Sequence, residues 1–210
     1  DPSVMQKSVL LCKKCGVQVG AHPGLPDLQG FGRRKMAIAP AEAEADVMYQ
    51  VGALKAFCDA AGVPLHHVKP HGALYNMAAK DSELAAAICR AVKAAAPEAM
   101  LLALSGSEMI KAAQALGLRV CSEVFADRGY QPDGTLVPRG KPGAIIENEE
   151  EAIARVLQMA KQGTVCAVDG SAVALQADSV CVHGDGPKAL AFVRKISAAL
   201  PAAGVEITAQ

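Results

Sequence analysis

The sequence contains no tryptophan, and aromatic residues make up only 3% of its 210 residues. Proteins that bind single-stranded nucleic acid stack bases on aromatic side chains, so this composition argues against that function. The formal net charge is zero, with 21 Lys and Arg against 21 Asp and Glu. Because a protein that binds the phosphate backbone carries a basic excess, we expect no nucleic-acid partner.

No apolar run reaches the roughly 20 residues that a membrane-spanning helix needs, and no signal peptide is visible. We therefore expect no membrane association and a cytoplasmic location. The seven cysteines are an odd number, which agrees with a reducing compartment. Cys12 and Cys15 form a CxxC pair, but no second pair follows and the pair falls in the last turn of an expected helix. We interpret these cysteines as structural.

Strand-like apolar segments alternate along the chain with amphipathic helices. The expected strands are 17–21, 64–69, 100–104, 118–122 and 179–182, with a closing strand at 205–208. The expected helices are 4–15, 107–116, and segments that begin at Pro40, at Asp81 or Ser82, at Asn148 and at Pro187. A hairpin that turns at Asp169 and Gly170 is expected within 164–176. This alternation predicts an α/β fold with a parallel sheet, in a single domain over residues 1–210.

Two topologies fit the alternation, a β/α barrel and an open doubly wound sheet. Neither the G-x-G-x-x-G nor the G-x-x-x-x-G-K-[ST] nucleotide-binding motif occurs in the sequence. Ionisable residues follow several different strands rather than one, which favours the barrel. The chain opens at Asp1 and Pro2 without an initiator methionine and enters a helix directly. We therefore expect the N-terminal strand of the barrel to be missing from this chain.

The carboxyl ends of barrel strands form the functional site, and the clearest such end here is the segment 68–76. In it Lys69 and His71 stand two positions apart, and Gly72 follows at once. Imidazoles exchange protons near neutral pH, and Lys or Arg side chains hold oxyanions or phosphates. The candidate catalytic residues at strand ends are His22, Lys69, His71, Glu123, His183 and Asp185. The candidate substrate-binding residues in the loops are Asp27, Arg33, Asp127, Arg128 and Arg139.

Some of these side chains have a plainer interpretation. His66 and His67 lie inside an expected strand, and we interpret them as structural. Arg33 and Arg34 fit a solvated surface pair as well as a ligand-binding role. Several histidines with an aspartate could bind a divalent metal, but no H-x-x-x-H or H-E-x-x-H motif occurs. The sequence therefore leaves metal dependence open.

Five blocks of the sequence closely resemble the LamB/YcsF family, in the family's order and over essentially the whole chain. These blocks are GAHPGLPDLQGFGRR (20–34), VKPHGALYN (68–76), EVFADR (123–128), DGTLVPR (133–139) and CVHGD (181–185). The resemblance implies a seven-stranded, TIM-like β/α barrel related to the glycoside hydrolase/deacetylase barrels. It also implies hydrolytic opening of 5-oxo-L-proline to L-glutamate, coupled to ATP hydrolysis and performed with partner subunits B and C.

Because the chain lacks a Walker loop, we expect the partner subunits to handle ATP while this chain opens the ring. In this scheme His22, His71 and His183 are acid–base candidates, Lys69 and Arg128 hold a phosphate or oxyanion, and Glu123 or Asp185 orients a histidine or water.

The chain departs from the family pattern in two places. The family begins with an Asp-x-Asn-x-Asp-x-Gly-Glu block and a Cys-Gly-x-His-Ala-Gly-Asp-Pro block, and only Asp1 and Pro2 of the second are present. Gly186 stands where an asparagine is expected.

Two alternative functions stay open at this point. One is a metal-dependent deacetylase or amidohydrolase on the same barrel, with His22, His71 and His183 at its centre. The other is a non-catalytic subunit that binds a small anion. A homo-oligomer is compatible with each reading.

Overall fold

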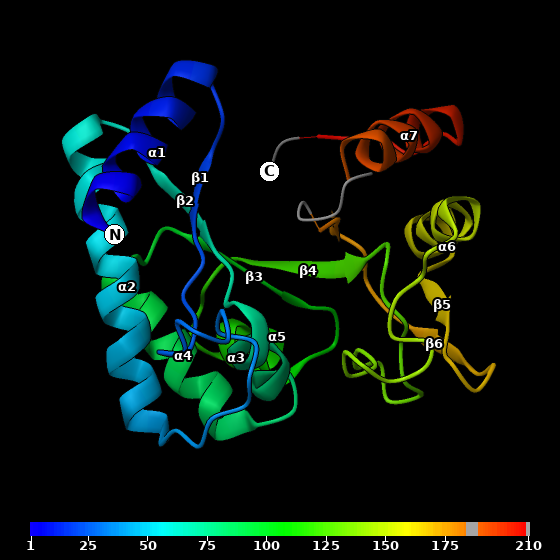
Figure 1. The fold of residues 1–210 in the computed structure, drawn as a ribbon, viewed down its shortest axis with the longest axis horizontal. Coiled ribbons are helices and arrows are strands. Elements are labelled where there is room, and N and C mark those ends of the chain that lie inside the picture. Colours follow the sequence, from blue (N-terminus) through cyan, green and yellow to red (C-terminus); the bar gives the residue numbers. More distant parts are fainter. Residues whose placement is uncertain (184–188, 209–210) are drawn as a thin grey trace. The chain divides into compact units, whose positions relative to one another are not determined.

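The computed structural model describes residues 1–183 and 189–208, and Figure 1 shows its ribbon. The chain divides into two compact units. Unit 1 comprises residues 1–103 and 107–121, and unit 2 comprises residues 104–106 and 122–210.

Unit 1 carries most of the helices and the first strands of the main sheet. Its elements are α1 (Pro2–Cys15), β1 (Val19–Ala21), α2 (Pro40–Ala61), β2 (Leu65–Val68), α3 (Gly72–Ala78), α4 (Ser82–Ala95), β3 (Met100–Leu104) and α5 (Glu108–Ala115). Helix α1 begins where the Asp1 carboxylate accepts a hydrogen bond from the N–H of Val4 at 3.0 Å. It packs beside α2, as the blue and cyan ribbons of Figure 1 show, and α2 packs in turn on α4.

The strands of unit 1 are parallel and in a register that brings their ends together. Ala21 of β1 pairs with Val68 of β2, and Val68 pairs with Leu101 of β3. Val68 and Leu101 are fully buried, as parallel strands covered by helices should be. Because β1 and β2 end at the same level, the residues that follow them, His22 and Lys69, emerge at one edge of the sheet.

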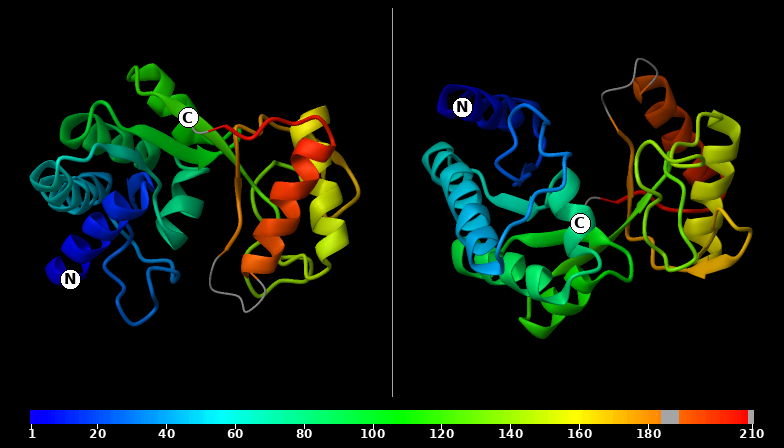
Figure 2. Two further views of the ribbon diagram at one scale, coloured as in Figure 1. Left: turned by 90° about the horizontal axis from the view of Figure 1, so that it is seen from above. Right: turned by 60° about the horizontal axis from the view of Figure 1, so that its bottom comes forward.

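Unit 2 combines a parallel strand pair with a separate hairpin and two helices. Its elements are β4 (Val120–Phe125, which begins in unit 1), α6 (Glu149–Gln162), β5 (Thr164–Cys166), β6 (Ala172–Ala174), β7 (Ser179–Cys181) and α7 (Ala189–Ala202). Strands β4 and β7 are parallel, with Phe125 opposite Cys181. Helices α6 and α7 lie side by side in every view of Figures 1 and 2, and Lys195 of α7 pairs with Glu149 of α6.

The predicted α/β fold is confirmed. The main sheet has the order β1-β2-β3-β4-β7, and helices lie between its successive strands along the chain, as in TIM-like β/α barrels. The predicted hairpin is confirmed as well, because β5 and β6 pair antiparallel. At its turn the Asp169 carboxylate accepts hydrogen bonds from the N–H and hydroxyl of Ser171.

Two predictions of local structure are wrong. The strand expected over 118–122 continues through Phe125, so Glu123 lies inside β4 rather than after it. No strand forms over 205–208, because the N–H of Val205 donates back to the carbonyl of Leu200 and caps α7. Helix α3 was not expected, since its first residue, Gly72, reads as a turn. The expected start of the last helix at Pro187 lies outside the described residues.

Over the two described ranges, no helix is both long enough and apolar enough to span a membrane.

Candidate active site

Three of the predicted site residues meet at the strand ends of unit 1. His22 directly follows β1, and its Nδ1 lies 2.6 Å from the carbonyl oxygen of Lys69, the residue that follows β2. The other ring nitrogen of His22, Nε2, lies 2.9 Å from Nδ1 of His71. The two rings meet edge to face, with centroids 4.7 Å apart. The structure therefore brings together His22, Lys69 and His71, as the sequence predicts.

The surroundings of His22 disfavour its charged form. His22 is exposed at the surface, but the protein atoms on one side of the ring replace part of its hydration, and this partial desolvation is the main cause that lowers its pKa from 6.5 to about 4. The nearby His71, Lys69 and His67 lower the pKa further, while the hydrogen bond to the Lys69 carbonyl opposes the fall. His22 is therefore a neutral imidazole when considered alone at pH 7.

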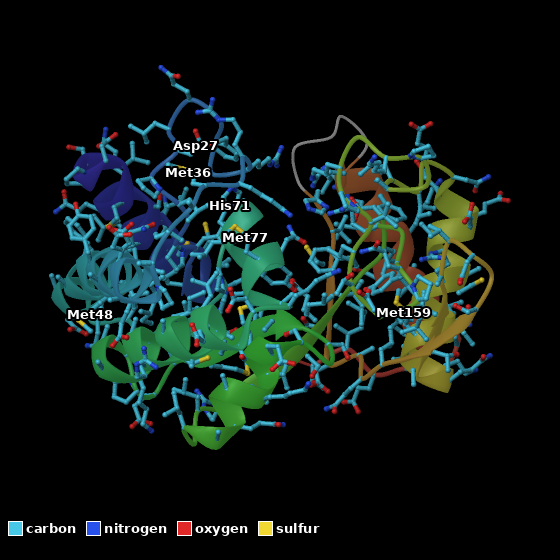
Figure 3. All side chains as sticks on the ribbon, turned by 90° about the horizontal axis from the view of Figure 1, so that it is seen from below. Asp27, Met36, Met48, His71, Met77 and Met159 are labelled. Carbon is cyan, nitrogen blue, oxygen red and sulfur yellow. The ribbon has the colours of Figure 1, made fainter. Side chains whose placement is uncertain are left out.

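The loop after β1 closes over His71. Phe31 offers its carbonyl oxygen to Nε2 of His71 at 2.7 Å, and its ring stands edge-on to the imidazole with centroids 5.2 Å apart. A Cβ atom added at Gly24 or Gly32 would lie 3.4 or 3.0 Å from His71 atoms, so the loop backbone approaches the ring closely. Figure 3 shows His71 and Asp27 on unit 1, together with Met77 of α3. The guanidinium of Arg33 lies 5.3 Å from the centre of the Phe31 ring.

Asp27, a predicted substrate-binding residue, holds this loop together. Its side chain is only 1% exposed, and it pairs with the Arg34 guanidinium, which is 64% exposed. It also accepts a hydrogen bond from the N–H of Gly30 at 2.9 Å. The Arg34 hydrogen bond is the largest cause that lowers the pKa of Asp27 to about 2. The Asp27 carboxylate therefore makes its ion pair and hydrogen bonds with residues of its own loop.

Replacing Asp27 with Asn should lower Tm at pH 7, because Arg34 and Gly30 lose their charged acceptor. Since the folded-state pKa is depressed to about 2, the carboxylate stabilises the fold above its ordinary pKa of 3.8. That contribution is lost as pH falls toward 2, so the Tm difference between Asp27→Asn and wild type should shrink from about pH 4 to about pH 2. Thermal unfolding followed by circular dichroism measures it.

The control for this prediction is Asp59→Asn, which removes an exposed pair with Lys55 on α2. Exposed helical pairs contribute little, so its Tm should change by less than that of Asp27→Asn at pH 7. Equal shifts for the two variants, or a pH-independent effect of Asp27→Asn, would contradict the role of Asp27.

His67, which we interpret as structural, packs across β1. A Cβ atom at Gly20 would lie 2.0 Å from Nε2 of His67, so only glycine leaves room for the ring. Its Nδ1 lies 3.0 Å from Nδ1 of His66. Desolvation, with His66 and Lys69 nearby, lowers the pKa of His67. This placement agrees with a neutral histidine that fills space beside the strand ends.

In unit 2, three predicted site residues form a second cluster. Nδ1 of His183 lies 2.8 Å from Oδ2 of Asp127, and Nε2 of His183 lies 3.0 Å from Nη2 of Arg139. A guanidinium only donates hydrogen bonds, so Nε2 must be the acceptor and the proton of a neutral ring must sit on Nδ1. The ring of Phe125 stacks on His183 with centroids 5.9 Å apart. The cluster is therefore an aspartate-oriented neutral imidazole whose Nε2 lone pair faces Arg139.

Arg128, predicted to hold a phosphate or oxyanion, has its guanidinium turned into the protein. The residue is 4% exposed, and it donates to the carbonyl oxygens of Ala144 at 2.9 Å and Val137 at 2.6 Å. Burial is the largest cause that lowers the pKa of Arg128, and Arg139 adds to it. Arg128 therefore ties the two ends of the loop 137–144 to the strand end at Phe125.

The remaining predicted residues are placed differently. Glu123 is 2% exposed inside β4, so it lies within the sheet rather than at the open strand end. Asp185 and Gly186 lie outside the described residues. Within the described ranges, no three His, Cys, Asp or Glu side chains lie close enough to hold a metal ion together.

The structure adds contacts for which the sequence carries little signal. The backbone carbonyl of Phe31 lies within hydrogen-bond distance of His71, and no pattern of side chains in the sequence predicts this contact. The phenol oxygen of the buried Tyr130 accepts the N–H of Phe125 at 2.9 Å and so fixes the end of β4. A left-handed backbone at Phe31, with φ of 55°, is uncommon for a residue other than glycine, and the flanking glycines at 30 and 32 were the available clue.

Parallel strands alternating with helices, with His22, Lys69 and His183 at or just after strand ends, define a β/α protein of the TIM-like class, whose functional groups follow the strands. Comparison with known proteins then gives the family. A family model described as the LamB/YcsF family matches residues 1–210, and the chain belongs to this family.

The relatives agree over nearly the whole chain. The A subunit of 5-oxoprolinase from Clostridium beijerinckii is 57% identical over 207 residues, which cover 99% of this chain and 81% of that protein. The A subunit of 5-oxoprolinase from Bacillus subtilis is 54% identical over 209 residues, which cover 100% of this chain and 81% of that protein. The crystal structure of a lactam utilization protein from Thermus thermophilus is 50% identical, covers 100% of this chain and 84% of that one, and superposes with a TM-score of 0.89.

Proposed function

We propose that this chain is the A subunit of a 5-oxoprolinase and that it opens the lactam ring of 5-oxo-L-proline to give L-glutamate. The observation that carries the proposal is the identity of 53–57% to proteins named as the A subunit of 5-oxoprolinase, over essentially the whole of this chain. The solved relative at 50% identity is itself named for lactam utilization, which supports the same substrate class.

The chemistry of the proposed reaction needs acid–base groups. An unstrained lactam is a poor electrophile, since attack on its carbonyl breaks the amide resonance, and the ring nitrogen must gain a proton as the C–N bond breaks. Two separate clusters contain groups of this kind, and each is considered by itself. His183, oriented by Asp127, offers a neutral imidazole that can take a proton from water once Arg139 moves off its lone pair. His22 and His71 offer a proton donor in unit 1.

We propose further that ATP is the co-substrate and that subunits B and C handle it. The relatives are each named as one lettered part of an enzyme, which supports the existence of partner subunits. The lack of a Walker motif in this sequence supports the assignment of ATP to the partners. A cytoplasmic location fits the seven cysteines, none of which forms a disulfide within the described part of the chain.

A metal-dependent hydrolase is the second candidate, because two imidazole nitrogens converge at His22 and His71. The fit is poor, since the described residues supply no third ligand beside that pair. We therefore derive no step through a metal.

The test is glutamate release from 5-oxo-L-proline by this chain, with and without its partner subunits B and C and ATP. Turnover is expected only in the assembled, ATP-supplied enzyme, and it should survive treatment with a metal chelator that leaves MgATP in excess. Full ATP-dependent turnover by this chain alone would overturn the division of labour. Turnover that survives His71→Ala in the assembled enzyme would favour a binding subunit without catalytic histidines at this position.

A further inference from the structure

The contacts of His22 and His71 form one continuous chain of three hydrogen bonds. It runs from the Lys69 carbonyl to Nδ1 of His22 (2.6 Å), from Nε2 of His22 to Nδ1 of His71 (2.9 Å), and from Nε2 of His71 to the Phe31 carbonyl (2.7 Å). All four ring nitrogens take part. At each end of this series of three hydrogen bonds stands a backbone carbonyl oxygen, which can only accept hydrogen bonds.

The number of protons that these three hydrogen bonds require fixes the charge of the His22–His71 pair. The two outer nitrogens must each carry a hydrogen, because each faces a carbonyl. A neutral imidazole carries only one N–H, so two neutral rings would leave two bare lone pairs facing each other across 2.9 Å. Two doubly protonated rings would leave two N–H groups facing each other instead. Only a pair with one added proton completes all three hydrogen bonds.

We propose that His22 and His71 hold one proton in common and act as a single acid of charge +1, which delivers that proton to the leaving nitrogen of the substrate. This inference rests on the proposed function for the identity of the substrate. In the step, the hydrogen bond between the two rings opens, the oxygen of water bonds to the lactam carbonyl carbon, the C–N bond breaks, and the nitrogen takes the proton that the pair had shared. The pair becomes neutral, the proton of the attacking water passes to the base, and a proton from solvent recharges the pair.

The groups around the pair favour a single proton over two. The cation beside the pair is Lys69, which lowers the pKa of His22, and the guanidinium of Arg33 lies over the Phe31 ring that contacts His71. In the loop after β1, the carboxylate of Asp27 is already paired with Arg34. The pKa of His22, lowered to about 4, agrees with a pair that takes its second proton only in acid.

Two substitutions keep the central hydrogen bond and remove the shared proton, and each also removes one outer hydrogen bond, to the Phe31 carbonyl in His71→Asn and to the Lys69 carbonyl in His22→Gln. In His71→Asn the side-chain amide stands at the position of Nδ1 and donates to Nε2 of His22, so the central hydrogen bond forms without an added charge. In His22→Gln the amide stands at the position of Nε2 and donates to Nδ1 of His71, with the same result. In the assembled enzyme we expect kcat to fall about 10²–10⁴-fold in both variants, with KM changed much less.

Proton-detected NMR of the full chain with ¹⁵N-labelled histidine tests the shared proton without any assay of turnover. At pH 7 we expect Nδ1 of His22 and Nε2 of His71 to be protonated, with one strongly deshielded proton between the other two nitrogens. That proton should be absent from His71→Asn and His22→Gln.

The outcomes separate this inference from the proposed function. Spectra showing two neutral rings at pH 7 overturn the shared proton, whatever the enzyme's substrate proves to be. Replacement of the shared proton by shifted ¹⁵N resonances of both histidines at one equivalent of added Zn²⁺ also overturns it, by assigning the two nitrogens to a metal. Full kcat in both variants overturns the acid role and leaves a structural pair. A confirmed shared proton in a chain that releases no glutamate would count against the proposed function alone.

Discussion

Replacing His183 with alanine in the assembled enzyme is expected to lower kcat/KM for 5-oxo-L-proline by about 10²–10⁴-fold. The imidazole is held by Asp127 at Nδ1, which places the lone pair on Nε2, where it can act as a base. In this structure that lone pair accepts a hydrogen bond from Arg139, so Arg139 must move before water can be activated. Steady-state glutamate release at saturating ATP measures the loss.

The matched control for this prediction is His183→Asn. Its side-chain amide can donate to Asp127 from the position of Nδ1, while nothing replaces Nε2. If His183 acts through Nε2, the asparagine variant should lose as much activity as the alanine variant. If His183 merely anchors Asp127, the asparagine variant should retain most of the activity, which would contradict the proposed base. Unchanged Tm values in both variants would show that the fold survives.

Replacing Gly129 with alanine is expected to destabilise unit 2 by about 3 kcal/mol, which lowers Tm by about 6–12 °C in a chain of this size. A Cβ atom at this position would lie 1.9 Å from the carbonyl oxygen of Gly143 and 3.1 Å from its carbonyl carbon. Both are backbone atoms, so no side chain can rotate away. The same stretch is tied by the hydrogen bonds from the N–H of Gly129 to Ala144 and from the N–H of Val137 to Gly129.

Gly52→Ala is the control, and its effect should have the opposite sign. Gly52 lies inside α2, with no atom within 4 Å of an added Cβ. Alanine favours the helix over glycine, so we expect a gain of about 0.5–1 kcal/mol in the free energy of unfolding. Thermal or urea unfolding followed by circular dichroism measures both variants. A Gly129→Ala protein as stable as wild type would show that the approach of Gly143 is not a constraint.

The sequence predicted the positions of the histidines at strand ends because parallel strands place their carboxyl ends at one edge of the sheet. Apolar runs that alternate with helices align their carboxyl ends, so the residues after the first two strands had to emerge at one edge. His22 and Lys69 confirm this. What the pattern could not supply is which atoms meet, since the contact between His22 and His71 depends on ring orientation and on a carbonyl offered by Phe31.

The misplaced end of the fourth strand has a physical cause, and Arg128 illustrates a related point. Ser122 and Glu123 looked like the end of a strand because polar residues usually leave the core, yet β4 is buried on both sides of Glu123 and continues. The role of Arg128 in holding a phosphate or oxyanion stays a prediction, and in this structure its guanidinium donates to loop carbonyls. The sequence shows that a charged side chain is present, whereas only the fold shows whether that side chain is already hydrogen-bonded to backbone groups.

The pairing of β4 with β7 also bears on how the protein is made. Glu123 lies opposite Ser179, so 56 residues separate the paired positions (179 minus 123). At roughly 5–20 residues per second, a ribosome needs about 3–11 s to synthesise that interval. During this time the apolar strand containing Val124 and Phe125 has no β7 to pair with, and such an unpaired edge can capture other chains. Slow translation of this interval would therefore lengthen the period in which the nascent chain depends on chaperones.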